Sequence, residues 1–255
     1  IMANGSETDR ECYDYVARRA AGSSPVLFPN SPFPRDCDAD GVRSDRLTAS
    51  GEGMMLADFR SHPHAAAAKL TLANVLALRL YSTAAFASIN EPLRALLRND
   101  GTPAAAHPFP VTVMFLADAI KKLRAVHATT STPRADATAG KAGSGGVMEL
   151  WRGLKDAILP DEFMALGGTE YAPMSTTRSL EVALAYSASA SPMLVRLRIE
   201  SVLQLGADLA FLSAFPNENE VLFPPLTYLR PLGPAMELSA GERCFTIVDV
   251  EPIIA

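Results

Sequence analysis

Hydrophobic positions divide the chain into a helical first half and a strand-rich second half. Over residues 63–97, leucine and valine recur every three or four residues, the spacing of one face of an α-helix. These positions are Leu70, Leu72, Val75, Leu76, Leu78 and Leu80, with alanines between them. Pro92 should end or restart this helix, because proline cannot donate a backbone hydrogen bond. Residues 111–127 predict a second helix, whose apolar stripe comprises Val113, Leu116, Ala117, Ile120, Leu123 and Val126.

Strands mixed with short helices are predicted after residue 147. Residues 195–199 alternate aliphatic side chains with two arginines, as in a strand with one solvated face. Residues 221–223 predict another strand, stopped by Pro224 and Pro225, and residues 245–250 predict a third. Residues 179–186 suit a short helix with Thr177 as its N-cap. Together with the helical first half, these elements predict an α+β fold.

Two segments lack either periodicity. Residues 4–53 are rich in Ser, Pro, Asp and Gly, as in Ser31-Pro32-Phe33-Pro34-Arg35-Asp36, and predict irregular chain. Residues 129–146 are small and polar. Their glycines do not form a phosphate-binding loop, because Lys141 precedes an alanine and not a serine or threonine, and Gly143-Ser144-Gly145-Gly146 does not match the dinucleotide-binding pattern GxGxxG. We therefore predict an irregular segment (1–60), a helical lead-in (61–128), a flexible linker or loop (129–146) and a β-rich core (147–255).

Composition narrows the classes of function. The chain has 255 residues, of which 48% are hydrophobic and 20% charged, so it can bury a sizeable core. A net charge of −5 without a dense Lys/Arg run argues against nucleic acid as a partner. No apolar run reaches the roughly 18 residues of a membrane span, and no signal peptide opens the chain, so we expect a cytoplasmic protein.

Cysteine and histidine spacing predicts neither disulfides nor a metal site. Cys12, Cys37 and Cys244 lie far apart, which indicates three free thiols. His62 and His64 flank a proline, but no nearby pair of ligands completes a metal site. We therefore expect chemistry that needs no metal.

Three motifs follow one another in the second half. They are Trp151-Arg152-Gly153, then Tyr171-Ala172-Pro173-Met174-Ser175-Thr176-Thr177, then Glu218-Asn219-Glu220-Val221-Leu222-Phe223-Pro224-Pro225. Alone, each fits an ordinary structural role: a surface arginine, a helix cap, and two glutamates on the exposed face of an edge strand. In this order and spacing they resemble the arginine-specific mono-ADP-ribosyltransferase family, whose pattern is Arg, then Ser-Thr-Ser, then Glu-x-Glu. The resemblance is clearest over residues 150–225 and extends upstream to Leu80-Tyr81-Ser82-Thr83 and Ile89-Asn90-Glu91-Pro92-Leu93-Arg94.

The resemblance implies a mixed small β-sheet, an ADP-ribosyltransferase-like catalytic core, behind a helical N-terminal half. It implies NAD as substrate, no metal, and a target protein carrying an acceptor arginine. Two positions depart from the family pattern. Thr177 stands where the family has serine, and the aromatic residue before the motif lies as far back as Tyr171. Tyr171 and Tyr186 are therefore both candidates for stacking on nicotinamide.

The same resemblance assigns roles that the chemistry of the side chains supports. Arg152 offers a planar, charged fork of donors to the phosphates of NAD. Gly153 would let the backbone approach the nicotinamide carboxamide, and Ser175 and Thr176 complete the NAD-binding set. Ser175 would orient Glu220, whose carboxylate would stabilise the positive charge that develops on the ribose as the nicotinamide bond breaks.

The remaining residues concern the acceptor. If residues 218–220 are extended, Glu218 lies on the same strand face as Glu220 and can hold an incoming guanidinium. Residues 208–217 would form the substrate-recognition loop, with Phe211 or Phe215 facing the target. An NAD glycohydrolase would use the same residues with water as acceptor. A binding or interaction module that has lost turnover is a third hypothesis.

Overall fold

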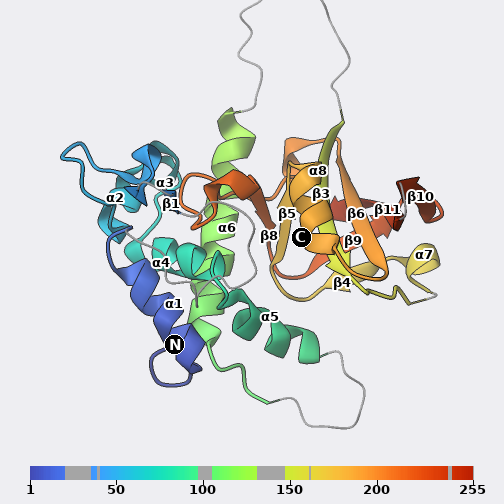
Figure 1. The fold of residues 1–255 in the computed structure, drawn as a ribbon, viewed down its shortest axis with the longest axis horizontal. Coiled ribbons are helices and arrows are strands. Elements are labelled where there is room, and N and C mark those ends of the chain that lie inside the picture. The colour runs from blue at the N-terminus through green and yellow to red at the C-terminus, as the bar shows by residue number, and fades with distance from the viewer. Residues whose placement is uncertain are drawn as a thin grey trace, which may run out of the picture.

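The computed structural model describes residues 1–20, 36–38, 41–96, 105–130, 147–160, 162–240 and 243–254, and shows a helical half beside a sheet (Figure 1). The helices of the first half are α1 (Glu7–Ala17), α2 (Leu56–Ser61), α3 (Pro63–Ala67), α4 (Leu72–Tyr81), α5 (Phe86–Ala95) and α6 (Pro110–Thr130). A two-stranded hairpin, β1 (Cys37–Asp38) with β2 (Gly41–Val42), lies between α1 and α2 in the chain. The expected α+β class is confirmed.

The second half forms a mixed sheet with two short helices. Its strands are β3 (Met148–Lys155), β4 (Gly168–Glu170), β5 (Met174–Thr177), β6 (Pro192–Ile199), β7 (Ala207–Asp208), β8 (Glu220–Phe223), β9 (Thr227–Pro231), β10 (Met236–Ala240) and β11 (Arg243–Ile253). The order is β4-β9-β11-β6-β3-β5-β8-β7, with β10 on β11; β6 and β11 are parallel and the other pairs antiparallel. The three strands predicted from the sequence are confirmed as β6, β8 and β11, the last extending further in both directions.

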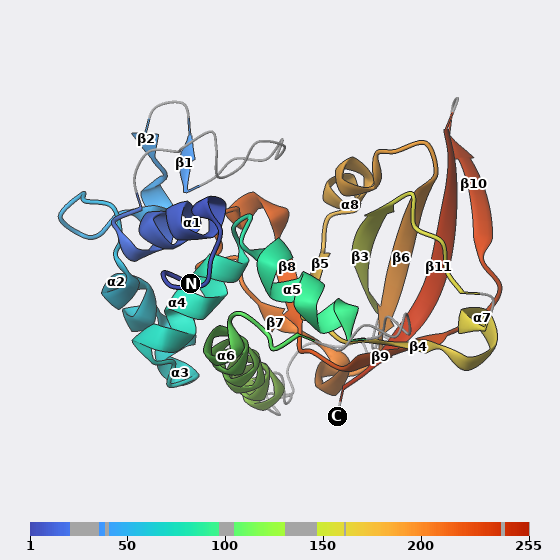
Figure 2. The same ribbon diagram turned by 90° about the horizontal axis from the view of Figure 1, so that it is seen from below.

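The sheet splits between β3 and β5. β3 pairs with β6 along its whole length, and β5 pairs with β8 over four residues. Within the described residues, β3 and β5 themselves pair at one position, Trp151 with Thr177. In Figure 2, β5, β8 and β7 accordingly lie between the helices and the remaining strands. A split of this kind leaves backbone and side chains of both strands available to a ligand.

The helical half packs directly against the strands at the split. The predicted stripe on α6 is confirmed, since Leu116, Ile120 and Leu123 are fully buried. Its hydrophobic core also includes Leu212 and Leu222, which belong to the β7–β8 region. A second core lies within the sheet. Burial of one continuous apolar cluster therefore fixes the helices relative to the strand that carries the Glu-x-Glu motif.

The long helix predicted over residues 63–97 breaks at two places, neither of them Pro92. Residues 68–71 separate α3 from α4, with Lys69 in a left-handed conformation (φ 52°). Pro92 lies inside α5, and the chain turns after α4, so that α4 and α5 meet at 85°. The hydroxyls of Ser82 and Thr83 donate to the carbonyls of Arg79 (2.7 Å) and Leu80 (2.6 Å). These hydroxyls satisfy carbonyls that the end of a helix leaves free, so the break needs no proline.

The prediction of irregular chain at the N-terminus is wrong for residues 7–17. Ser6 and Asp9 form a capping box, in which each side chain accepts a hydrogen bond from the other residue's backbone N–H. Cys12 and Val16, one turn apart, are buried against the helical half. Residues 21–35, 39–40 and 131–146, which include the Pro-rich run and most of the predicted linker, lie outside the described residues.

The second short helix, α8 (Leu180–Ser187), begins one residue later than predicted, and its cap lies two residues later than the predicted Thr177. Its cap is Ser179, whose hydroxyl accepts from the N–H of Val182, and Thr177 bonds elsewhere. The helix packs closely on β3 because Gly153 has no side chain. A Cβ at Gly153 would lie 2.0 Å from the carbonyl oxygen of Ala183.

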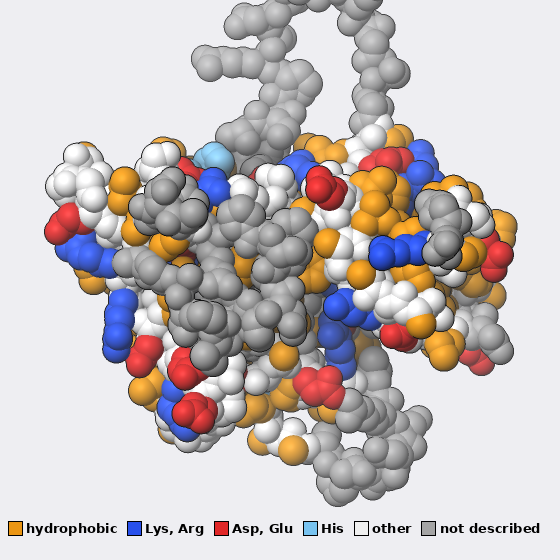
Figure 3. All heavy atoms as spheres, viewed as in Figure 1, with side chains coloured by type: hydrophobic (Ala, Val, Ile, Leu, Met, Phe, Trp, Pro, Cys, Tyr) orange, Lys and Arg blue, Asp and Glu red, His pale blue; other side chains and the backbone are white. Residues whose placement is uncertain are grey.

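Charged side chains of both signs are interspersed on the face shown in Figure 3. No single helix of the described part of the chain is long and apolar enough to cross a membrane; only α4 and α5 taken together reach that length and composition.

We predict that Gly153→Ala is destabilising because α8 must move away from β3 to admit the methyl group. Overpacking of this kind costs about 1–3 kcal/mol. The matched control is Gly233→Ala, since a Cβ there meets no atom within 4 Å. Urea unfolding of both variants tests the prediction. Equal stability of the two variants would show that α8 is free to shift.

Candidate active site

Arg152 bridges the split in the sheet. It follows Trp151, the last residue of β3 that pairs with β5. Its Nη1 donates a hydrogen bond of 2.8 Å to the carbonyl oxygen of Ser175, so that a guanidinium links the two strands where the ladder stops. Partial burial lowers the pKa of Arg152, and the nearby carboxylate of Glu170 opposes this shift. The structure thus brings the first two sequence motifs into direct contact.

The hydroxyls of β5 hold the third motif against this pair. Thr176 Oγ1 donates to the carbonyl of Val221 (2.7 Å), and Thr177 Oγ1 donates to the carbonyl of Glu218 (2.5 Å). Thr177 pairs with Glu220 in the β5–β8 ladder. Its role is therefore to fix the backbone of the Glu-x-Glu turn, a role for which any β-hydroxyl suffices.

The expectation that residues 218–220 are extended is wrong. Glu218 ends a 3-10 turn (Pro216–Glu218), and Glu220 is the first residue of β8. Asn219 between them adopts a left-handed conformation with φ 49°, which asparagine tolerates better than most residues. The two carboxylates are nevertheless close enough that Glu218 raises the pKa of Glu220.

Burial controls the ionisation of Glu220. The side chain is 5% exposed, and desolvation, followed by repulsion from Glu218, raises its pKa to about 8. A hydrogen bond from the Ser175 side chain favours the charged form and lowers the pKa in part. The Ser175 side chain is thus close to Glu220, and the role of Ser175 in orienting Glu220 for catalysis stays a prediction. A carboxylate held in this way is poised to stabilise a cationic group.

Glu218 has a different partner. The hydroxyl of Tyr186, on α8, donates to Glu218 Oε1 at 2.5 Å. Desolvation raises the pKa of Glu218 to about 7, and this hydrogen bond limits the rise. A carboxylate with a pKa near neutrality is suited to accept a proton. Tyr186 therefore contacts Glu218, while its stacking on nicotinamide stays a prediction.

The helical half contributes polar residues that sequence analysis did not assign. Tyr81, on α4, donates to the carbonyl of Pro173 (2.8 Å), and Asn90, on α5, donates to the Tyr81 hydroxyl (3.0 Å). The Tyr81 hydroxyl is also close enough to Glu220 for that carboxylate to raise its pKa, after the larger effect of burial. Both residues belong to the two upstream segments to which the sequence resemblance extends, and these segments could have indicated them.

A second guanidinium lies near Arg152. Arg94, on α5, forms a two-point contact with Glu170, at 3.1 Å and 2.9 Å. Its charge contributes to lowering the pKa of Arg152. Two arginines, Arg94 and Arg152, therefore lie near Glu170 at the split. The other two glutamates there are Glu218 and Glu220.

The other predicted site residues differ in placement. Gly153 lies against α8, and its lack of a side chain allows this close packing. The contact of Gly153 with the nicotinamide carboxamide stays a prediction. Stacking of Tyr171 on nicotinamide also stays a prediction. Phe211 stacks on His62, with ring centroids 4.7 Å apart. Phe215 does not face outward as expected, since it is 5% exposed and packs in the core formed with α1 and α4.

Among the residues that the structure describes, no group of three or more His, Cys, Asp or Glu side chains is arranged to hold a metal ion.

Comparisons with known proteins identify the fold. No protein-family model matches the chain, and no curated protein matches it significantly in sequence. The ADP-ribosyltransferase HopU1 of Pseudomonas syringae pv. tomato DC3000 is 17% identical, with 96% of this chain and 97% of that chain covered and a TM-score of 0.52. Plx2a, an ADP-ribosyltransferase toxin from Paenibacillus larvae, is 15% identical over 78% of this chain and 91% of that chain, with a TM-score of 0.50. The chain therefore has the fold of ADP-ribosyltransferases.

We predict that Glu220 destabilises the folded protein at alkaline pH. Its pKa rises from 4.5 to about 8 on folding, so the native state binds more protons than the unfolded state between these values. Stability should therefore fall as pH rises through this window. Glu220→Gln removes this cost, and at about pH 8.5 it should stabilise the protein by about 2–4 kcal/mol, since one pKa unit corresponds to about 1.4 kcal/mol.

Chemical unfolding at about pH 5 and about pH 8.5 measures the effect. The gain from Glu220→Gln should be small at the lower pH, where the native glutamate is already neutral. Glu237→Gln, on the exposed part of β10, is the control and should show no such difference. A pH-independent gain would mean that Glu220 is charged in the folded protein throughout.

Proposed function

We propose that this protein transfers ADP-ribose from NAD to an arginine of a target protein and releases nicotinamide. The observation that carries the proposal is the convergence of Arg152, Ser175, Glu218 and Glu220 at the split between β3 and β5. These residues come from three strands and a turn that are far apart in the sequence. The fold shared with ADP-ribosyltransferases supports the same reaction class.

NAD binding would use the arginines at the split. Arg152 uses one of its five N–H donors on Ser175, which fixes the plane of the guanidinium and leaves donors for a pyrophosphate. Arg94 adds positive charge to the same region and is itself held by Glu170. A dinucleotide with two negative phosphates and a cationic nicotinamide thus fits a site with arginines at one end and glutamates at the other.

Breaking the nicotinamide bond would depend on Glu220. As this bond lengthens, its electron pair leaves with the nicotinamide nitrogen, and positive charge develops on the ribose. The Glu220 carboxylate would stabilise that charge, provided that it is ionised. Because the nicotinamide of NAD is cationic, its arrival favours the charged form of a carboxylate whose pKa burial has raised. Ser175 fixes the carboxylate for this purpose.

Transfer to arginine would depend on Glu218. A guanidinium nitrogen of the target attacks the ribose carbon that nicotinamide leaves and must then lose a proton. The Glu218 carboxylate pairs with the guanidinium and accepts this proton, for which its pKa of about 7 is suited. Tyr186 holds the carboxylate in place. In an NAD glycohydrolase, the alternative activity, water would attack the same carbon and Glu218 would have no guanidinium to bind.

Charge-neutral variants of the two glutamates should separate the two steps. Glu220→Gln should abolish transfer and nicotinamide release, with a loss of about a hundred- to thousand-fold in rate, while NAD still binds. Glu218→Gln should abolish transfer to arginine or a small guanidine, while slow release of nicotinamide to water persists. The assay follows labelled acceptor and free nicotinamide in parallel. Equal loss of both activities in Glu218→Gln would refute the division of labour, and nicotinamide release without any transfer by the unaltered protein would identify a glycohydrolase.

Arg152→Lys should weaken NAD binding although it keeps the positive charge, because lysine cannot form a two-point contact with phosphate. A loss of about tenfold in affinity is expected. Arg198→Lys, on the neighbouring strand β6, is the control. Calorimetry measures the affinity of both variants. If both bind NAD as the unaltered protein does, Arg152 has only its structural contact with Ser175.

A further inference from the structure

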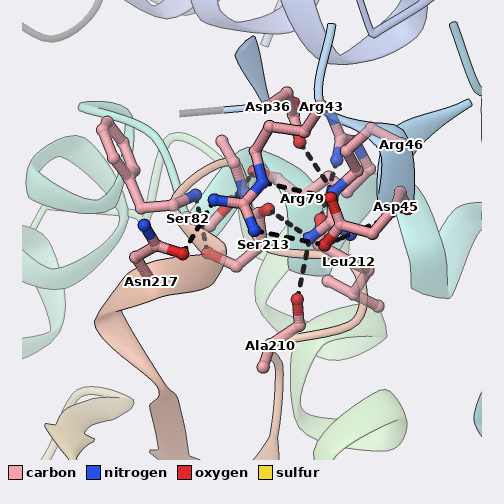
Figure 4. A network of polar contacts seen from close by, with 12 residues as sticks. Asp36, Arg43, Asp45, Arg46, Arg79, Ser82, Ala210, Leu212, Ser213 and Asn217 are labelled. Carbon is pink, nitrogen blue, oxygen red and sulfur yellow. Dashed lines mark hydrogen bonds and ion pairs between the residues drawn. The ribbon is translucent and has the colours of Figure 1, made fainter. Parts of the chain in front are cut away.

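The loop of residues 209–217, between β7 and the Glu-x-Glu turn, is bound by side chains from distant parts of the chain (Figure 4). Arg46 Nη2 donates to the carbonyls of Ala210 (2.7 Å) and Ser213 (3.2 Å). Arg79 Nη1 donates to the carbonyl of Leu212 (2.7 Å). At the ends of the loop, Ser82 Oγ accepts from Ala214 N (3.0 Å) and Arg43 Nη1 donates to Asn217 Oδ1 (2.7 Å).

A single buried carboxylate holds the two central arginines. Asp36 Oδ1 accepts from Arg46 Nε (3.0 Å), and Asp36 Oδ2 accepts from Arg79 Nη2 (2.7 Å). Tyr15, on α1, donates a third hydrogen bond to Asp36. Asp36, Arg46 and Arg79 are at most 2% exposed. Their side chains therefore have no access to water as an alternative partner.

The charges in this cluster make the loop contacts necessary. Asp36 supplies one fully buried negative charge for two buried guanidiniums. Asp45, which also contacts Arg46, is half exposed and neutralises them less. The Phe59 ring lies 4.1 Å from the Arg79 guanidinium and covers one face of it. Arg46 Nη2 and Arg79 Nη1 find their acceptors in the loop carbonyls, and Arg46 Nη1 donates to Asp45. Displacing the loop would leave Arg46 Nη2 and Arg79 Nη1 without these acceptors in a buried site, which is unfavourable even though both guanidiniums remain paired with Asp36.

The loop ends at Glu218. The carbonyl of Phe215 accepts from the N–H of Glu218 (3.0 Å), and Phe215 is itself buried in the helical core. The backbone of Glu220, by contrast, pairs with Thr177 of β5, and its carbonyl accepts from the N–H of Leu209, which directly follows β7. Glu220 is thus held by the strands on both sides of β8 and contacts the loop at its first residue, whereas Glu218 directly follows the loop's last residue.

We infer that Asp36, Arg46 and Arg79 are positioning residues for the acceptor step. They hold residues 209–217 in one conformation, so that Glu218 stays where a guanidinium meets the ribose carbon, and they leave Glu220 and NAD cleavage to the sheet. The inference rests on the proposed function, because it concerns the step that distinguishes transfer from hydrolysis. It assigns a role in acceptor use to the N-terminal segment, which contains none of the three motifs.

Arg46→Lys and Arg79→Lys in the full chain test this inference. Each keeps the charge but loses the planar fork that reaches Asp36 and the loop together. Transfer to a small guanidine such as agmatine should fall about 10- to 100-fold, the effect of a displacement of about 1 Å. Nicotinamide release without acceptor should change by less than about twofold, while hydrogen exchange of residues 209–217 becomes faster.

The matched control is Arg124→Lys. Arg124, on α6, donates to the carbonyls of Leu205 (2.9 Å) and Leu203 (2.8 Å), which is the same type of contact outside the loop. It should change neither activity. If the buried substitutions prevent folding, Arg43→Ala provides a second test. It removes the hydrogen bond from Arg43 to Asn217 at the end of the loop and should lower transfer alone, to a smaller extent.

The outcomes separate the inference from the proposed function. Equal loss of transfer and nicotinamide release, or unchanged transfer with faster exchange in the loop, overturns the positioning role while the proposed function stands. Absence of transfer by the unaltered protein overturns the proposed function and the inference with it. A selective loss of transfer that Arg124→Lys does not reproduce supports both.

Discussion

The position of the loop before the Glu-x-Glu turn depends on the carboxylate of Asp36, which is fully buried. Asp36 joins the N-terminal segment, helix α4 and, through two arginines, the loop before the Glu-x-Glu turn. In a buried site an N–H group without an acceptor is costly, and the N–H groups of a guanidinium point in fixed directions in one plane. The carbonyls of the loop are therefore held in place by the requirements of the arginines. The N-terminal segment, which contains none of the three motifs, thus helps to fix the loop that leads to Glu218.

The split in the sheet imposes a second constraint. Continuous pairing of β3 with β5 would fill the space with backbone hydrogen bonds and leave no polar groups for a ligand. Because pairing ends at Trp151 and Thr177, Arg152 can cross to Ser175, and the carboxylates of β8 and its turn gather nearby. Burial then raises the pKa of both glutamates, to about 8 and about 7. Ionisation of the two glutamates is therefore unfavourable in the absence of a cation, and a cation bound beside them would favour the charged forms.

Local sequence signals account for much of the fold and for the composition of the site. The stripe on α6, the alternation in β6 and the prolines after β8 each encode their own element, because the periodicity of buried positions is a local property. Arg152, Ser175, Glu218 and Glu220 are candidates because the order and spacing of three motifs resemble a known family pattern. The helix α1 also had a local signal, the Ser6–Asp9 capping box, within a segment whose overall composition indicated irregular chain. The break between α4 and α5 depends on hydroxyl contacts, which the position of Pro92 did not reveal.

Other features depended on contacts between residues far apart in the chain. Arg79 lies on a helix, where a charged residue is ordinarily solvent-exposed, yet it is buried because Asp36 and the carbonyl of Leu212 meet it there. Phe215 points into the core and Gly153 accommodates a helix, because the neighbours that decide these roles come from α1, α4 and α8. The left-handed Asn219 and the turn around it likewise follow from the pairing of β5 with β8. The sequence by itself determined most of the elements and, through the motif resemblance, which residues are candidates for the chemistry, since periodicity and motifs are local properties. Only the tertiary structure decided which of these residues meet and how burial changes their charge, since these depend on long-range packing.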